Sequence, residues 1–94
     1  MKQIANEISF IITTYNTPVF LEIVLKSVMK QQVFPLEVIV ADDGSGTPTC
    51  ELIARYQKVF PVPLIHSWIP DEGFRVSKAR NVAAACARGI YLVM

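Results

Sequence analysis

Three short polar segments contain the residues of this sequence whose types and spacing could do chemistry. They are residues 13–16, residues 42–45 and residues 71–75. In the first segment, Tyr15 offers a ring that could stack on a base or a sugar. In the second, the carboxylate of Asp43 could accept paired hydrogen bonds from the edge of a base or from a ribose. Together these two groups favour the binding of a nucleoside.

A group of cations lies in and just after the third segment. Arg75, Lys78 and Arg80 could face phosphate, and the N-terminus of a helix expected there would add a partial positive charge. The three segments together favour a nucleotide with a phosphate tail. The sequence has neither the GxGxxG fingerprint nor the Walker sequence, which excludes the usual dinucleotide fold and the P-loop class.

Each of these features also has an ordinary structural explanation. An Asp-Asp-Gly-Ser sequence is typical of a plain turn, and Tyr15 alone would be a packing residue at a rim. Asn16 would then be a turn residue, His66 a tolerated residue on a strand, and Trp68 a packing residue. Arg88 is expected at a solvated helix end. A site is favoured because the polar segments all follow apolar runs, which independent turns would not require.

Apolar runs alternate with amphipathic stretches along the whole chain. The runs predict strands at residues 8–13, 36–41, 64–68 and 90–94. Helices are predicted from Pro18, with Thr17 as its cap, from Pro48, and from a cap at Ser77, while residues 32–35 read as a connector. This order predicts a parallel, doubly wound α/β sheet in three layers, α/β/α. The carboxyl ends of parallel strands meet at one edge, where the polar segments should converge.

The composition bounds the size and the partners of the protein. With 94 residues, the chain has room for one small domain, residues 1–94. A formal charge of +1 gives no field that would hold nucleic acid, and no apolar run approaches the roughly 20 residues that cross a bilayer. Cys50 and Cys86 lie far apart, with no CxxC motif and no clustered histidine, which favours neither a zinc site nor a disulfide. We therefore expect a cytoplasmic protein, with peripheral attachment at the inner face of the membrane as the alternative.

The same segments resemble the family 2 inverting glycosyltransferases of the GT-A fold. Residues 8–16 are similar to the family's opening strand and its Tyr-Asn turn, and residues 37–45 to its second strand and Asp-Asp-Gly-Ser loop. Residues 72–81, with Gly-Phe-Arg and Ala-Arg-Asn, and residues 89–93 are similar to the stretch that leads into the metal-binding strand. The resemblance covers nearly the whole chain and implies an incomplete, Rossmann-like sheet of the GT-A type.

The resemblance implies a role for each matching residue. Thr13 and Tyr15 would line a uracil pocket, with Asn16 in the same turn. Asp43 would bind the nucleoside, with Asp42 beside it. The donor phosphates or the sugar would lie against Arg75, Lys78, Arg80 and Asn81. The implied reaction is a single-displacement transfer of a sugar, with inversion, from a nucleotide-sugar of the UDP type to a hydroxyl of a carbohydrate or glycolipid acceptor. Such a reaction serves polysaccharide or glycoconjugate synthesis.

A divalent metal ion, Mg²⁺ or Mn²⁺, is also implied, held by an Asp-x-Asp motif that would follow Met94. No residue of this chain would then be a metal ligand or the catalytic base, and we expect the chain as given to be a truncated, inactive donor-nucleotide half. A strand exposed at residues 90–94 would favour association between copies. The alternatives are a non-catalytic nucleotide-binding module and a phosphorylation receiver. The receiver is disfavoured because its acidic pair should follow the first strand.

Overall fold

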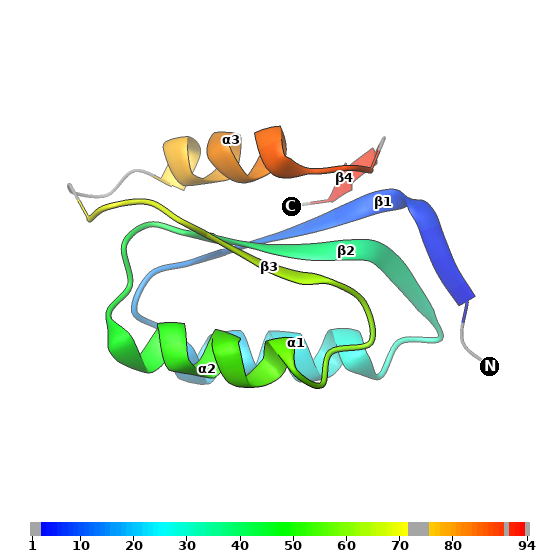
Figure 1. Ribbon diagram of the computed structural model, residues 1–94, viewed down its shortest axis with the longest axis horizontal. Coiled ribbons are helices and arrows are strands. Elements are labelled where there is room, and N and C mark those ends of the chain that lie inside the picture. The colour runs from blue at the N-terminus through cyan, green and yellow to red at the C-terminus, as the bar shows by residue number, and fades with distance from the viewer. Residues whose placement is uncertain (1–2, 72–75, 90, 94) are drawn as a thin grey trace.

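A computed structural model describes residues 3–71, 76–89 and 91–93, in which strands and helices alternate along the chain (Figure 1). The elements are β1 (Gln3–Thr14), α1 (Pro18–Met29), β2 (Val33–Asp42), α2 (Thr47–Gln57), β3 (Leu64–Trp68), α3 (Val76–Cys86) and β4 (Tyr91–Val93). The strands form one sheet in the order β3-β2-β1-β4, and each neighbouring pair is parallel. The parallel sheet predicted from the sequence is therefore confirmed.

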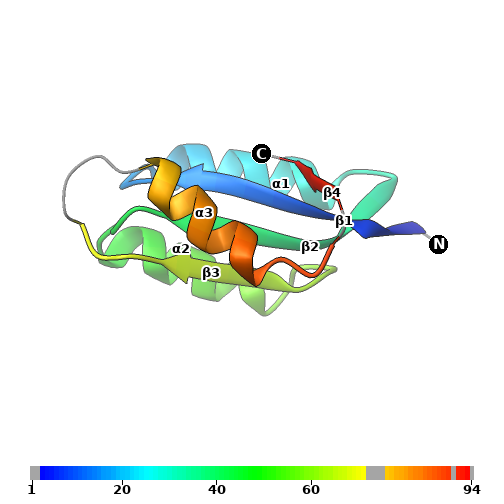
Figure 2. The same ribbon diagram turned by 90° about the horizontal axis from the view of Figure 1, so that it is seen from above.

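Helices cover both faces of the sheet. α1 and α2 lie on one face, and α3 lies on the other (Figures 1 and 2). The chain changes face after β3, which gives the three-layer, doubly wound arrangement expected of alternating strands and helices. Because the strands are parallel, the loops that follow β1, β2 and β3 all emerge at the same edge of the sheet.

Alternating side chains on the strands supply two apolar cores, one on each face of the sheet. Val38 and Val40 are fully buried on the side of α1 and α2, where they pack in one cluster with Leu25 and Ile53. The cluster on the side of α3 consists of Ile11, Ile39, Ala41, Ile69, Ala79 and Ala83. The alanines of α3 in this cluster are almost completely buried, so the small face of α3 lies close to the sheet.

Both β1 and β2 begin earlier than the sequence predicts. β1 starts at Gln3 rather than at residue 8, and β2 starts within the segment expected to be a connector. Residues 3–5 pair with residues 33–35 and extend both strands. β3 does not run alongside this part of β2, so Pro35 has a neighbouring strand on one side only. A proline is tolerated there because one side of the strand needs no ladder hydrogen bond.

Two of the expected helix caps are wrong in detail. α1 begins at Pro18 as predicted, but Thr17 makes no side-chain cap hydrogen bond within the described part of the helix. Its hydroxyl oxygen instead lies 3.2 Å from the hydroxyl oxygen of Thr14. α3 begins at Val76, so Ser77 lies inside the helix rather than at its cap. Thr17 therefore joins the loop after β1 to the end of that strand.

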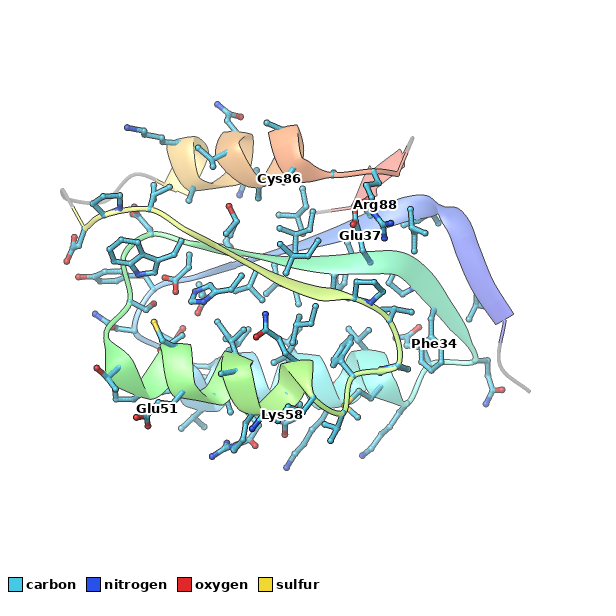
Figure 3. All side chains as sticks on the ribbon, in the orientation of Figure 1. Phe34, Glu37, Glu51, Lys58, Cys86 and Arg88 are labelled. Carbon is cyan, nitrogen blue, oxygen red and sulfur yellow. The ribbon has the colours of Figure 1, made fainter. Side chains whose placement is uncertain are left out.

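A buried carboxylate in the middle of β2 binds the neighbouring strand and the segment after α3. Glu37 is 0% exposed and accepts hydrogen bonds from the Ser9 hydroxyl, at 2.7 Å, and from the backbone N–H of Arg88, at 2.6 Å. The Arg88 Nε donates to its other oxygen at 3.0 Å (Figure 3). Burial alone would raise the pKa of Glu37, but these donors outweigh it and hold the pKa below its usual value. Arg88, expected at a solvated helix end, thus ties the segment after α3 to the sheet.

Candidate functional site

The loops after β1, β2 and β3 are joined at the carboxyl edge of the sheet. The backbone N–H of Asp43 donates to the carbonyl of Thr14 at 3.1 Å, and the N–H of Ile69 donates to the carbonyl of Asp42 at 3.0 Å. These bonds continue the pairing of the strands into the loops. Residues 13–16, residues 42–45 and Asp71 therefore lie at one edge, where the sequence pattern predicts a site.

A hollow of about 210 Å³ opens at this edge, between the ends of β1 and β2 and the start of α3. Its walls are formed by Thr13, Thr14, Tyr15, Thr17, Ala41, Asp43 and Ala79. Three residues predicted to bind the nucleoside, Thr13, Tyr15 and Asp43, are thus brought together. Pockets that hold whole drug-sized ligands usually measure roughly 300–1,000 Å³. The hollow is therefore suited to one part of a larger ligand, such as a base.

The ring of Tyr15 is positioned by a long-range hydrogen bond. Its hydroxyl donates to Oδ2 of Asp71 at 2.7 Å, which joins the loop after β1 to the segment after β3. The hydrogen bond to Asp71 and the negative charge of that carboxylate raise the pKa of the Tyr15 phenol. Tyr15 is 39% exposed, so its ring lies at the rim of the hollow rather than in the core.

Gly44 allows the loop after β2 to pass directly against the segment after β3. Its φ is +94°, in the left-handed region, and a Cβ atom at this position would lie 2.4 Å from the backbone nitrogen of Asp71. A contact that short requires the backbone itself to move, and only glycine adopts this conformation without strain. The Asp-Asp-Gly-Ser segment is thus a turn whose shape depends on its third residue.

Asp42 faces the opposite side of the sheet from Asp43. It is 0% exposed, its Oδ1 accepts the backbone N–H of Ser45 at 2.8 Å, and its Oδ2 lies 2.7 Å from Nε2 of His66. Burial alone would raise the pKa of Asp42, but the hydrogen bonds from His66 and Ser45 outweigh it and lower the pKa. The resemblance implies a place for Asp42 beside Asp43 at the nucleoside. In the structure Asp42 instead lies on the other side of the sheet from the hollow.

Ser45 links the loops after β1 and β2 to the end of β3. Its hydroxyl accepts the backbone N–H of Asn16 at 2.8 Å, and its carbonyl accepts Nε1–H of Trp68 at 3.0 Å. Asn16, which has a positive φ of 50°, in turn accepts the N–H of Gly46 through its Oδ1 at 2.8 Å. The side-chain oxygen of Asn16, a predicted site residue, thus binds the protein's own backbone and fixes the loop.

The structure describes three of the four residues predicted to contact the donor phosphates or the sugar. Arg75 lies outside the described residues. Lys78 and Asn81 are exposed on α3, and Arg80 is half-buried. The Nε atom of Arg80 is buried and makes no hydrogen bond among the described residues. Ala79, between two of these residues, lines the hollow, so the first turns of α3 adjoin it.

The sequence analysis explains His66 and Trp68 as ordinary strand and packing residues, and it includes Asp71 in a polar segment without predicting its contact with Tyr15. The parallel register carries the signal for the first two, because Val40 pairs with His66 and Asp42 pairs with Trp68. Residues two apart on a strand share a face, so a histidine near the end of β3 lies next to an aspartate at the end of β2. The contact of Tyr15 with Asp71 has no such signal, since it joins two loops.

The family of the chain follows from comparison with known proteins. A family model described as "Glycosyl transferase family 2" matches residues 9–94. The chain belongs to glycosyl transferase family 2. The resemblance of the three polar segments is thereby confirmed, and the sheet described above is the corresponding, incomplete Rossmann-like part of the family fold.

Several curated relatives are similar to this family 2 segment. Over 82 residues it is 35% identical to the hyaluronan synthase and 29% identical to the chondroitin synthase of Pasteurella multocida, covering 86% of this chain and 8% of each relative. It is 33% identical to the validoxylamine A glucosyltransferase of Streptomyces hygroscopicus subsp. limoneus over 82 residues, which is 85% of this chain and 18% of the relative. The chain thus spans less than a fifth of the length of these relatives. Within the described residues, no helix combines the length and the apolar character that crossing a membrane requires.

The described residues do not fit the Mg²⁺ or Mn²⁺ ion that the resemblance implies. Mg²⁺ prefers several oxygen ligands arranged around one point. Asp42 and Asp43 face opposite sides of the sheet, and Asp71 accepts the hydroxyl of Tyr15. The cluster of potential metal ligands found in the described part of the chain contains sulfur and nitrogen as well as oxygen.

Proposed function

We propose that this chain forms the donor-nucleotide half of a glycosyltransferase that moves a sugar from a UDP-type donor to an acceptor hydroxyl, with inversion. Membership of glycosyl transferase family 2 supports sugar transfer as the reaction class. The observation that carries the proposal is the hollow that Thr13, Tyr15 and Asp43 line together at the carboxyl edge of the sheet. Ligands of open parallel sheets bind at this edge.

The chemistry of the hollow suits a nucleoside. The Asp43 side chain, in a residue only 2% exposed, would accept a hydrogen bond from a ring N–H of uracil or from a ribose hydroxyl. The ring of Tyr15, held by Asp71, would cover the base from the rim. A volume of about 210 Å³ would admit the base, while the diphosphate and the sugar would lie outside it.

The diphosphate would lie toward α3 in this arrangement. Lys78 and Arg80 are cations in the first turns of that helix, next to the wall formed by Ala79. Cations and a helix N-terminus both stabilise phosphate. We extend this role to Asn81 and Arg75, as the resemblance implies. Use of Mg²⁺ or Mn²⁺ by the enzyme and a cytoplasmic location remain parts of the proposal.

A carbohydrate acceptor is supported by the names of two relatives, a hyaluronan synthase and a chondroitin synthase. A glycolipid acceptor and association of copies through residues 90–94 also remain proposals. As the resemblance implies, the chain described here would bind the donor nucleotide and would not complete a transfer by itself.

The experiment that tests the proposed function is a calorimetric titration of the chain with UDP, CDP and GDP, each with and without Mn²⁺. We expect UDP to bind about tenfold more tightly than CDP or GDP, and equally well without metal. Asp43→Asn keeps the size of the side chain and should weaken UDP binding by about 1–3 kcal/mol. Glu51→Gln is the matched control, because Glu51 is exposed on α2 (Figure 3). Equal affinities for the three nucleotides, or an Asp43→Asn variant that binds UDP like the wild type, would contradict the proposal.

A further inference from the structure

Behind the Asp42–Ser45 turn, on the side of α2, three potential metal ligands lie together. They are a carboxylate oxygen of Asp42 at the end of β2, the Sγ of Cys50 on α2 and a ring nitrogen of His66 on β3. These atoms all lie within 4.8 Å of one another. The three ligands come from three different elements and include only one cysteine, so the spacing of the two cysteines does not indicate this site.

The three ligand types match the coordination chemistry of zinc. Zn²⁺ binds cysteine sulfur at about 2.3 Å and histidine nitrogen or carboxylate oxygen at about 2.0–2.2 Å, so ligand atoms around one tetrahedral ion lie roughly 3.3–3.8 Å apart. His66 Nε2 and Asp42 Oδ2, now 2.7 Å apart, would separate slightly, and Cys50 would move inward. A carboxylate and a thiolate together balance the charge of a divalent ion, with His66 neutral.

The surroundings of the cluster support its use as a site. The Oδ1 atom of Asp42 accepts the N–H of Ser45 at 2.8 Å, which orients the carboxylate and leaves Oδ2 toward the cluster. Such outer hydrogen bonds are typical of metal-binding side chains. Cys50 is half-buried, and the His66 side chain is 19% exposed, so an ion can reach the cluster from solvent.

We propose that Asp42, Cys50 and His66 form a binding site for a zinc-like divalent transition-metal ion between α2 and the ends of β2 and β3. Sulfur and nitrogen ligands select such an ion over Mg²⁺, which prefers oxygen. Cys50 binds as the thiolate and releases its proton to solvent as the ion enters. Three protein ligands leave the fourth tetrahedral position to water.

A metal ion in this site would stabilise the strands and the helix that support the candidate nucleotide site. It replaces the hydrogen bond between His66 and Asp42 with bonds that also include Cys50, so α2 becomes tied to β2 and β3 below the loop that carries Asp43. An ion that binds the folded chain alone also stabilises it by mass action. The proposal stands independently of the proposed function, because neither the site nor its test involves a nucleotide.

Cobalt titration with zinc competition tests the site directly. The two cysteines are both free, and Cys86 is exposed on α3, so Cys86→Ser is the matched control for Cys50→Ser. We expect the wild type and Cys86→Ser to bind one Co²⁺ per chain with thiolate-to-metal charge-transfer absorption, which Zn²⁺ abolishes. Cys50→Ser should lose that absorption. His66→Gln, whose amide can still bond Asp42, should weaken Co²⁺ binding about tenfold or more.

Any one of the following results would overturn the metal site: charge-transfer absorption that persists in Cys50→Ser, absorption that disappears in Cys86→Ser, or a folded wild type that binds neither Co²⁺ nor Zn²⁺. Thermal unfolding of each variant without metal shows whether it is folded, and serine is close to cysteine in size. A His66→Gln variant with wild-type Co²⁺ affinity would likewise remove His66 from the site and contradict the proposal. None of these results depends on UDP binding.

Discussion

Asp42 and Asp43 are adjacent in the sequence and serve opposite sides of the sheet. Asp43 lines the hollow on the side of α3, together with Thr13 and Tyr15. Asp42 is 0% exposed on the side of α2, with one oxygen bonded to Ser45 and the other to His66. Because successive side chains point to opposite faces at the end of a strand, one step along the chain separates the two tasks. The two aspartates thus have separate roles: Asp43 can contact a ligand, and Asp42 holds the loop in place.

The two sides also differ in how well the polar groups there are hydrogen-bonded within the protein. On the side of Asp42, hydrogen bonds from Ser45, His66 and Trp68 close a network around the turn. On the side of Asp43, the walls leave a hollow of about 210 Å³. The closed side fixes the backbone from which Asp43 projects. A site held in this way loses less conformational freedom when a ligand binds.

The largest effect is expected from Gly44→Ala, which should damage both sides at once. The new Cβ would lie 2.4 Å from the Asp71 backbone nitrogen at a φ of +94°. We expect the free energy of unfolding to fall by about 2 kcal/mol or more, measured by urea denaturation, and UDP binding to be lost. Gly46→Ala is the control, since a Cβ atom at Gly46 would lie 3.8 Å from the Asn16 Oδ1, an ordinary van der Waals contact. Similar losses in both variants would contradict the role assigned to Gly44.

A buried carboxylate whose hydrogen bonds all come from the protein should make the free energy of unfolding sensitive to acid. Glu37 is such a carboxylate. Its pKa lies below the usual 4.5, so its contribution to stability is present above about pH 4.5 and is lost as pH falls through the lowered value. We expect Glu37→Gln to reduce the free energy of unfolding at pH 7 by about 1–3 kcal/mol and to flatten its decline below pH 4.5. Urea denaturation at a series of pH values measures both effects, with Glu51→Gln as the exposed control. An unchanged pH profile would show that the buried contacts of Glu37 do not stabilise its charge.

On the open side, Tyr15→Ala should act on binding more than on stability. Removing a ring that stacks on a base costs roughly 1–3 kcal/mol of binding free energy by analogy with other base–aromatic contacts. Tyr15→Phe keeps the ring and loses only the hydrogen bond to Asp71, so its effect on UDP affinity should be smaller, about 1 kcal/mol or less. Calorimetry with UDP measures both variants. If Phe and Ala weaken binding equally, the hydroxyl matters and stacking does not.

The fold could be predicted because its signals are local. Runs of β-branched residues such as 8–13 and 36–41, each followed by a polar turn and a proline at a helix start, fix the order of the elements. The extension of β1 and β2 was not predictable in the same way. Residues 3–7 include polar side chains, and Pro35 disfavours a strand until its unpaired side is known.

The candidate site was predictable in its location and only partly in its contacts. The position of Tyr15 and Asp43 at one edge follows from the parallel sheet. The bond of His66 to Asp42 and the ion pair of Arg88 with Glu37 join residues 24 and 51 positions apart, so they depend on register and packing that the sequence does not state. A residue whose partners are distant in the sequence therefore shows no sign in the sequence of the hydrogen-bond network to which it belongs.

The division between Asp42 and Asp43 is tested most directly by measuring UDP affinity and the free energy of unfolding on both Asp42→Ala and Asp43→Ala. We predict that Asp43→Ala weakens UDP binding about tenfold or more, while Asp42→Ala lowers the free energy of unfolding by about 1–3 kcal/mol and does so more than Asp43→Ala. Metal chelator in all samples keeps the proposed zinc-like site out of the comparison. An Asp43→Ala variant with wild-type UDP affinity, or an Asp42→Ala variant as stable as the wild type, would contradict the account.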